Sequence, residues 1–154
     1  MKNTLLLLIM LFTVSLLNAN HIFPSQADST KRTFYKGTID ASINIWFYIN
    51  EQEHPCGGNS TILNAMYRYD DQDQWILLNV TSDRQKKNFC FVEDFLSGVL
   101  FLEKNENGFI GNWVSPNAHK QFPVELEKVE LYDETSEKLD EILFDDLIFS
   151  KNDC

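Results

Sequence analysis

The feature that most constrains the fold is a series of short apolar runs, separated by turn residues, that fills the middle of the chain. Within these runs apolar and polar side chains alternate. In residues 43–49 every second side chain is aliphatic or aromatic and shares one face, namely Ile43, Ile45, Phe47 and Ile49. A period of two is the period of a β-strand that buries one face. The pattern therefore predicts a protein built from strands.

About eight such runs follow one another with short connections, and Asn105-Glu106-Asn107-Gly108 is typical of a hairpin turn. Eight antiparallel strands are enough for a sheet to close on itself and remove its edges. We therefore predict an all-β fold, a single antiparallel meander of about eight strands closed or nearly closed into a barrel, over residues 34–129. The runs span residues 34–39, 43–49, 61–69, 75–80, 88–92, 99–103, 109–114 and 122–129.

The end of the chain has a different character, because eleven acidic residues and only three lysines lie between Glu125 and Cys154. Within residues 136–149, four aliphatic side chains recur at helical spacing, which predicts an amphipathic helix with Asp133 or Thr135 as its N-cap. A final strand over residues 146–149 is the alternative. The four side chains are Leu139, Ile142, Leu143 and Leu147. Residues 130–154 are thus predicted to form an acidic C-terminal segment, a helix or an extra strand.

Residues 1–19 have the parts of a secretory signal peptide, with Lys2, an apolar run and a small residue, Ala19, at its end. The run is shorter than the roughly 20 apolar residues that a membrane span needs. No cysteine follows within ten residues, as a lipoprotein anchor would require. We therefore expect cleavage near Ala19, a polar linker over residues 20–33, and a periplasmic or secreted product without membrane insertion.

Three cysteines, Cys56, Cys90 and Cys154, would enter an oxidising compartment, where one pair is expected to bridge. The sequence leaves the three pairings open. We favour Cys56–Cys90, because Cys154 is the last residue of a chain end that would fray.

No residue pattern predicts catalysis, a metal site or a cofactor. The three histidines, His21, His54 and His119, are isolated from one another and lack the spacing of zinc ligands. Glu93-Asp94 is interpreted as a pair of solvated turn charges. The formal net charge of −10 argues against a nucleic-acid partner. We therefore expect a protein that is not an enzyme.

Two groups of residues are candidates for binding. Trp46, Tyr48 and Trp75 would line a ligand pocket if they point into the barrel, or pack as core if they do not. The acids of the C-terminal segment would attract a basic partner through their charge. The acids that we select on the predicted helix are Asp140, Glu141, Asp145 and Asp146.

The order of aromatic and glycine residues resembles a family of small secreted bacterial proteins, mostly of unknown function. Its pattern is tyrosine-x-glycine-x-isoleucine, tyrosine-x-tyrosine, phenylalanine-x-glycine-x-tryptophan and proline-x-x-leucine, which residues 35–39, 67–69, 109–113 and 123–126 match. The resemblance implies a compact barrel-like meander, related in shape to lipocalins and avidins, and implies no activity. Ala65 and Asn79 replace two glycines of the pattern, which bears on local strand curvature.

These observations together predict a non-enzymatic periplasmic or secreted binding protein. Its most concrete form is an inhibitor or immunity-type protein that captures a basic enzyme or toxin acting on the cell wall. A barrel that holds a small apolar ligand and a structural envelope protein are the alternatives. The sequence does not indicate an oligomeric state.

Overall fold

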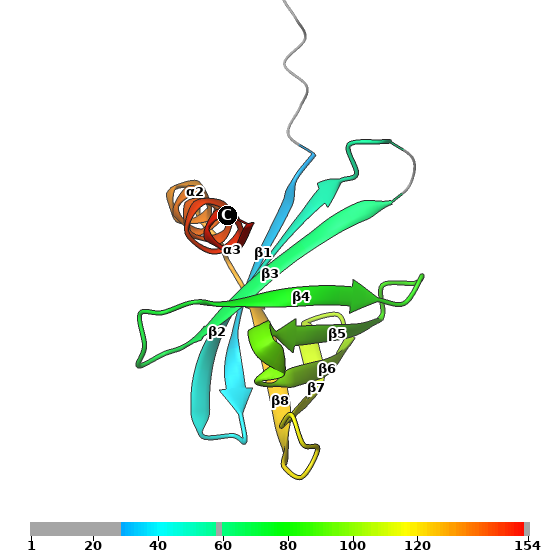
Figure 1. Cartoon of the computed structure of the whole chain (residues 1–154), viewed down its shortest axis with the longest axis vertical. Coiled ribbons are helices and arrows are strands. Elements are labelled where there is room, and N and C mark those ends of the chain that lie inside the picture. Colours follow the sequence, from blue (N-terminus) through cyan, green and yellow to red (C-terminus); the bar gives the residue numbers. More distant parts are fainter. Residues whose placement is uncertain (1–28, 58–59, 153–154) are drawn as a thin grey trace, which may run out of the picture.

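The computed structural model describes residues 29–57 and 60–152, and it is a closed antiparallel barrel in which each strand pairs with the next and β8 pairs with β1 (Figure 1). The predicted fold class is confirmed. The predicted signal peptide, and the predicted linker as far as residue 28, lie outside the described residues. Strand β1 begins at Lys31 rather than at Phe34. The strands are β1 Lys31–Ile39, β2 Ile43–Glu53, β3 Thr61–Tyr69, β4 Ile76–Ser82, β5 Asn88–Glu93, β6 Val99–Lys104, β7 Gly108–Val114 and β8 Gln121–Val129.

Aromatic side chains fill the inside of the barrel. Alternation turns every second residue of each strand inward, and the rings that meet there pack mostly edge to face. Phe47 and Phe91 lie 5.0 Å apart between ring centroids at 84°, and Phe89 and Phe109 lie 5.3 Å apart at 90°. Tyr67 stacks on Phe47. The interior is thus a packed core, in the manner of small eight-stranded barrels.

Two glycines of the sequence pattern stand where neighbouring strands approach most closely. A Cβ added at Gly37 would overlap with the carbonyl oxygen of Glu125 on β8, and one added at Gly111 would overlap with that of Phe101 on β6. Only a residue without a side chain allows such an approach. These glycines therefore permit the tight curvature that closes the sheet.

The C-terminal segment is a helix, as predicted, and the alternative of a final strand is wrong. It runs through α2 (Asp133–Glu141), the wider π-helical turns of η2 (Ile142–Phe149) and α3 (Ser150–Asn152). Its N-cap is Tyr132, which has extended backbone and no side-chain capping bond, so neither Asp133 nor Thr135 caps it. The helix lies against the outside of the barrel, beside β1 and β3 (Figure 1).

The buried face of this helix makes a second apolar cluster outside the barrel. Leu139 and Leu143 pack against Phe34, Tyr48 and Met66, which are outward side chains of β1, β2 and β3. The spacing of four between the two leucines places both on one helix face. The helix therefore buries the outward apolar side chains at the centre of β1, β2 and β3.

The predicted Cys56–Cys90 disulfide is not formed, because both residues are free thiols in the structure. Cys56 lies in the exposed connection after β2, whereas Cys90 faces outward on β5, and β3 and β4 separate those strands in the sheet. The alternation of β5 turns Phe89 and Phe91 inward and leaves Cys90 on the outside. Cys154 lies outside the described residues.

Candidate binding surface

The aromatic residues predicted to bind a ligand lie outside the barrel. Trp46 and Tyr48 are outward residues of β2, Trp75 immediately precedes β4, and all three belong to the cluster beneath the helix. Trp46 stacks on Phe34 with ring centroids 5.2 Å apart, and the Lys36 ammonium lies 3.6 Å from its ring centroid. Tyr48 also donates a hydrogen bond to the helix. All three side chains pack outside the barrel, so they do not line an internal pocket.

Asp140 points toward the barrel instead of toward solvent, which corrects its place in the predicted contact surface. Its carboxylate accepts hydrogen bonds from Arg32 Nε at 2.6 Å, from the Tyr48 hydroxyl at 2.6 Å and from Asn50 Nδ2 at 2.7 Å. Glu141, Asp145 and Asp146, the other three selected acids, are exposed. Asp140 follows Leu139 directly, so it lies at the edge of the buried face. Sequence spacing alone does not indicate whether Asp140 lies on the buried face or on the exposed face of the helix.

The Asp140 network is a partly buried polar link between helix and sheet. Asn50 is fully buried, and its Oδ1 atom has no hydrogen-bond partner. Burial and the hydrogen bond to Asp140 raise the pKa of Tyr48 far above its usual value. A network of this kind in a low-dielectric setting fixes geometry strongly because each unpaired member would be costly. It therefore fixes the position of the helix.

Glu93 forms a second polar cluster at one end of the barrel interior, which corrects its interpretation as a solvated turn charge. Its carboxylate accepts hydrogen bonds from the Tyr67 hydroxyl at 2.6 Å, Trp113 Nε1 at 2.8 Å and Ser97 Oγ at 2.7 Å. A Cβ at Gly98 would overlap with both Trp113 Nε1 and the carboxylate, so the cluster packs closely against the backbone of Gly98. The cluster joins β3, β5 and β7 at this end of the barrel.

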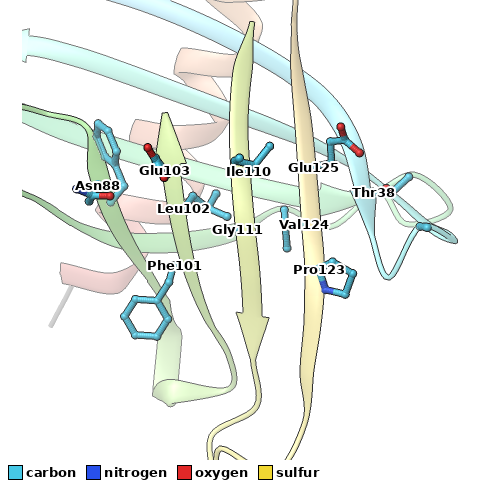
Figure 2. Close-up of a pocket in the computed structure, with 12 residues that line it drawn as sticks. Thr38, Asn88, Phe101, Leu102, Glu103, Ile110, Gly111, Pro123, Val124 and Glu125 are labelled. Atoms are coloured by element: carbon cyan, nitrogen blue, oxygen red, sulfur yellow. The ribbon is translucent and has the colours of Figure 1, made fainter. Parts of the chain in front are cut away.

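An uncovered hollow lies on the opposite half of the outer surface, over β5 to β8. It measures about 780 Å³ and is shown in Figure 2. Phe101 on β6 and Ile110 on β7 project into solvent there, 53% and 46% exposed, and Pro123 lies on β8 beside them. Isolated exposed apolar side chains are ordinary, whereas several on one face make that face a candidate binding surface.

Carboxylates border this hollow. The strand register places Ile110 directly between Glu103 on β6 and Glu125 on β8. Glu103 pairs with the exposed Lys87 at 2.9 Å, and the side chain of Glu125 is exposed. An apolar floor with acidic edges can receive an apolar side chain flanked by basic residues. We call the surface formed by Phe101, Glu103, Ile110, Pro123 and Glu125 the β6–β8 face.

The sequence analysis missed this surface although the strands that carry it were predicted. Phe101 and Ile110 both occupy outward positions of their strands, on either side of the hairpin turn at residues 105–108. Residues at diagonal positions of paired strands lie close enough for large side chains to touch. Aligning the two runs about that turn would have placed both side chains on the same face.

Comparison with protein-family models, with curated proteins and with solved structures finds no match for the chain. Within residues 29–57 and 60–152, no three His, Cys, Asp or Glu side chains come together in a group that could hold a metal ion. None of the helices in the described part of the chain is both long and apolar enough to cross a membrane.

Proposed function

We propose that the chain is a non-enzymatic binding protein and that the β6–β8 face binds a basic protein segment carrying an exposed apolar side chain. The observation that carries the proposal is the hollow of about 780 Å³, with an apolar floor and carboxylates at its edges. A secreted or periplasmic inhibitor of a basic enzyme or toxin is the most concrete form of this function.

The apolar part of the surface supports a protein partner. Binding energy at protein interfaces concentrates in a few aromatic or aliphatic side chains that fill pockets. Phe101 and Ile110 are exposed in the free protein and belong to adjacent strands, so the sheet holds them in place without a partner. A surface that is rigid before binding loses little conformational entropy on association.

The charge of the surface indicates the partner's sign. The chain carries a formal net charge of −10, and Glu103 and Glu125 flank Ile110 across the sheet. Complementary charge around an apolar contact accelerates association and excludes partners of the wrong sign. A basic segment is therefore the occupant that this face fits best.

The alternative of a small apolar ligand inside the barrel has less support. Rings such as Phe47, Phe91 and Phe109 pack against one another in the interior, and the three aromatics expected to line a pocket lie outside it. A small ligand also needs a site that encloses most of its surface. The β6–β8 face is an open sheet surface.

A peptide titration tests the proposal. The probe is a synthetic peptide in which arginines flank one phenylalanine, followed through the amide resonances of the full chain. We expect shifts confined to β6, β7 and β8, and about tenfold weaker affinity for Ile110→Ala, which corresponds to about 1.4 kcal/mol. Ile43→Ala is the matched control, because Ile43 is similarly exposed, at 41% against 46%, and lies outside the hollow.

Two further peptides separate the parts of the proposal. One keeps the arginines and replaces phenylalanine by serine, and the other keeps phenylalanine and replaces the arginines by glutamates. Both should bind far more weakly than the probe. Equal binding of all three peptides, or equal losses for Ile110→Ala and Ile43→Ala, would contradict docking at this face.

A further inference from the structure

The end of the barrel remote from Glu93 carries a small hollow lined by lysines. It measures about 30 Å³, and Lys31 at the start of β1, Lys86 in the connection between β4 and β5, and Lys104 at the end of β6 all line it. Three segments far apart in the sequence thus bring ammonium groups to one opening. This group of positive charges contrasts with the formal net charge of the chain, which is −10.

Aromatic and aliphatic side chains share the wall of the hollow with the charged ones. The rings of Phe89 and Phe109 and the side chain of Ile49 line it, together with Tyr35 and Thr33. Burial raises the pKa of Tyr35 to about 12, although a hydrogen bond with Thr33 opposes the shift, so its hydroxyl keeps its proton at neutral pH. An anion in the hollow would therefore meet hydroxyl donors and no phenolate.

One carboxylate, that of Glu51, also lines the hollow, and it is already paired. Lys86 Nζ donates hydrogen bonds to Glu51 Oε1 and, at 2.6 Å, to Thr61 Oγ1, while Thr61 donates to the same carboxylate at 3.1 Å. Burial alone would raise the pKa of Glu51, but these hydrogen bonds outweigh it and lower the pKa. The lining residues that remain after this pairing include two lysines, Lys31 and Lys104.

Lys104 is a partly buried ammonium with other lysines around it. Burial lowers its pKa, the positive charge of Lys31 lowers it further, and the carboxylate of Glu51 opposes the shift. Two like charges at one opening repel each other unless an anion lies between them. Three lysines and one glutamate line the opening, which therefore carries an excess of positive charge.

The backbone holds Lys86 in an unfavourable conformation at this opening. Its φ is 51°, in the left-handed region, and its N–H donates to the Asp83 carbonyl at 3.0 Å within the turn. Strained positions of this kind tend to persist where function requires them. Here the strained backbone carries the side chain that pairs with Glu51, so Lys31 and Lys104 face a carboxylate that already has a hydrogen-bonded partner.

We propose that this lysine-lined opening binds one oxyanion, a phosphate- or sulfate-type group. A hollow of about 30 Å³ accepts one oxygen-sized group. One oxygen of the anion would enter it, and the rest would lie between the ammonium groups of Lys31 and Lys104. Lysine binds phosphate as a point charge and needs no bidentate geometry. This site lies at one end of the barrel and is independent of the β6–β8 face.

Thermal unfolding of the full chain tests the site, with sodium phosphate, sulfate and chloride compared at equal ionic strength. Phosphate or sulfate should raise the unfolding midpoint above its value in chloride for the wild type, because a ligand of the native state stabilises it. Lys104→Gln should abolish that rise and should not lower the midpoint in chloride, since the repulsion with Lys31 is gone. Lys120→Gln, at the opposite end of the barrel, should retain the full rise.

A second variant and a second ligand complete the test. Lys31→Gln, at an exposed position, should weaken phosphate binding at least several-fold in an amide-resonance titration without changing the fold. Tighter binding of glycerol 3-phosphate than of inorganic phosphate would identify a phosphate carried on a larger molecule, and equal binding would identify the free ion. No rise in the wild type, or an equal rise in wild type, Lys104→Gln and Lys120→Gln, would overturn the proposal.

Discussion

The two halves of the barrel's outer surface both carry large apolar side chains that point outward. These side chains are buried on one half and exposed on the other. Over β1 to β3, Phe34, Tyr48 and Met66 face outward and are buried, because the C-terminal helix packs on them. Over β6 and β7, Phe101 and Ile110 also face outward and remain about half exposed. The comparison shows that the burial of a large apolar side chain on the outer face depends on whether the C-terminal helix packs over it.

The ion pairs of the two halves also differ in burial. On the covered half, Asp140 and Arg32 meet in a partly buried network that fixes the helix. On the open half, Glu103 and Lys87 form an exposed pair, and such pairs contribute only about 0–1 kcal/mol. Charges of the covered half should therefore govern stability, and charges of the open half should govern association.

The largest effect is expected from Leu143→Ala on the covered half. Leu143 is fully buried between helix and barrel, so truncation should lower the free energy of unfolding by about 2–5 kcal/mol. Phe101→Ala on the open half removes a larger side chain and should change it by less than about 0.5 kcal/mol. Urea denaturation of both variants measures the difference. Similar losses at the two positions would mean that the halves are not distinct.

A smaller loss is expected from Asp140→Ala. The variant leaves the buried donors of Tyr48 and Asn50 without their acceptor, which should destabilise the protein by about 1.5–3 kcal/mol. Glu141→Ala, the next residue and exposed, is the control and should have little effect. If the two variants unfold at the same urea concentration, the network does not hold the helix.

Alkaline pH should loosen the covered half through Tyr48. Burial and the Asp140 carboxylate raise the pKa of Tyr48 in the folded state, while the unfolded value is about 10. The resulting stability is fully present below about pH 10 and is lost as pH rises further, by about 1.4 kcal/mol per pH unit for one such group. Denaturation midpoints from pH 9 to 12 should fall less steeply for Tyr48→Phe, and parallel curves would argue against this origin.

The smallest effect on stability, and a clear one on binding, is expected from Glu125→Gln on the open half. Association with the arginine–phenylalanine peptide should slow and depend less on salt, because one rim charge of the β6–β8 face is lost. The free energy of unfolding should stay within about 0.5 kcal/mol. Glu106→Gln, in the β6–β7 turn, serves as the charge-matched control. Equal kinetics for both variants would assign the effect to net charge alone.

The sequence by itself determined the barrel and the helix, because both follow from local periodicity. Alternation over eight runs specifies which side chains turn inward, and glycines such as Gly37 and Gly111 mark where strands meet closely. Spacing of Leu139 and Leu143 identified the buried face of the helix. These signals lie within short windows of the chain, where the geometry of strand and helix is regular.

The tertiary structure alone decided what the outward side chains meet. Arg32 and Asp140 are 108 residues apart in sequence, so nothing local indicates that they pair. The same holds for the position of the helix over Tyr48 and for the enclosure of Glu93 by Tyr67 and Trp113. An outward strand position looks identical in sequence whether it is covered or open, because burial there depends on where a distant segment docks.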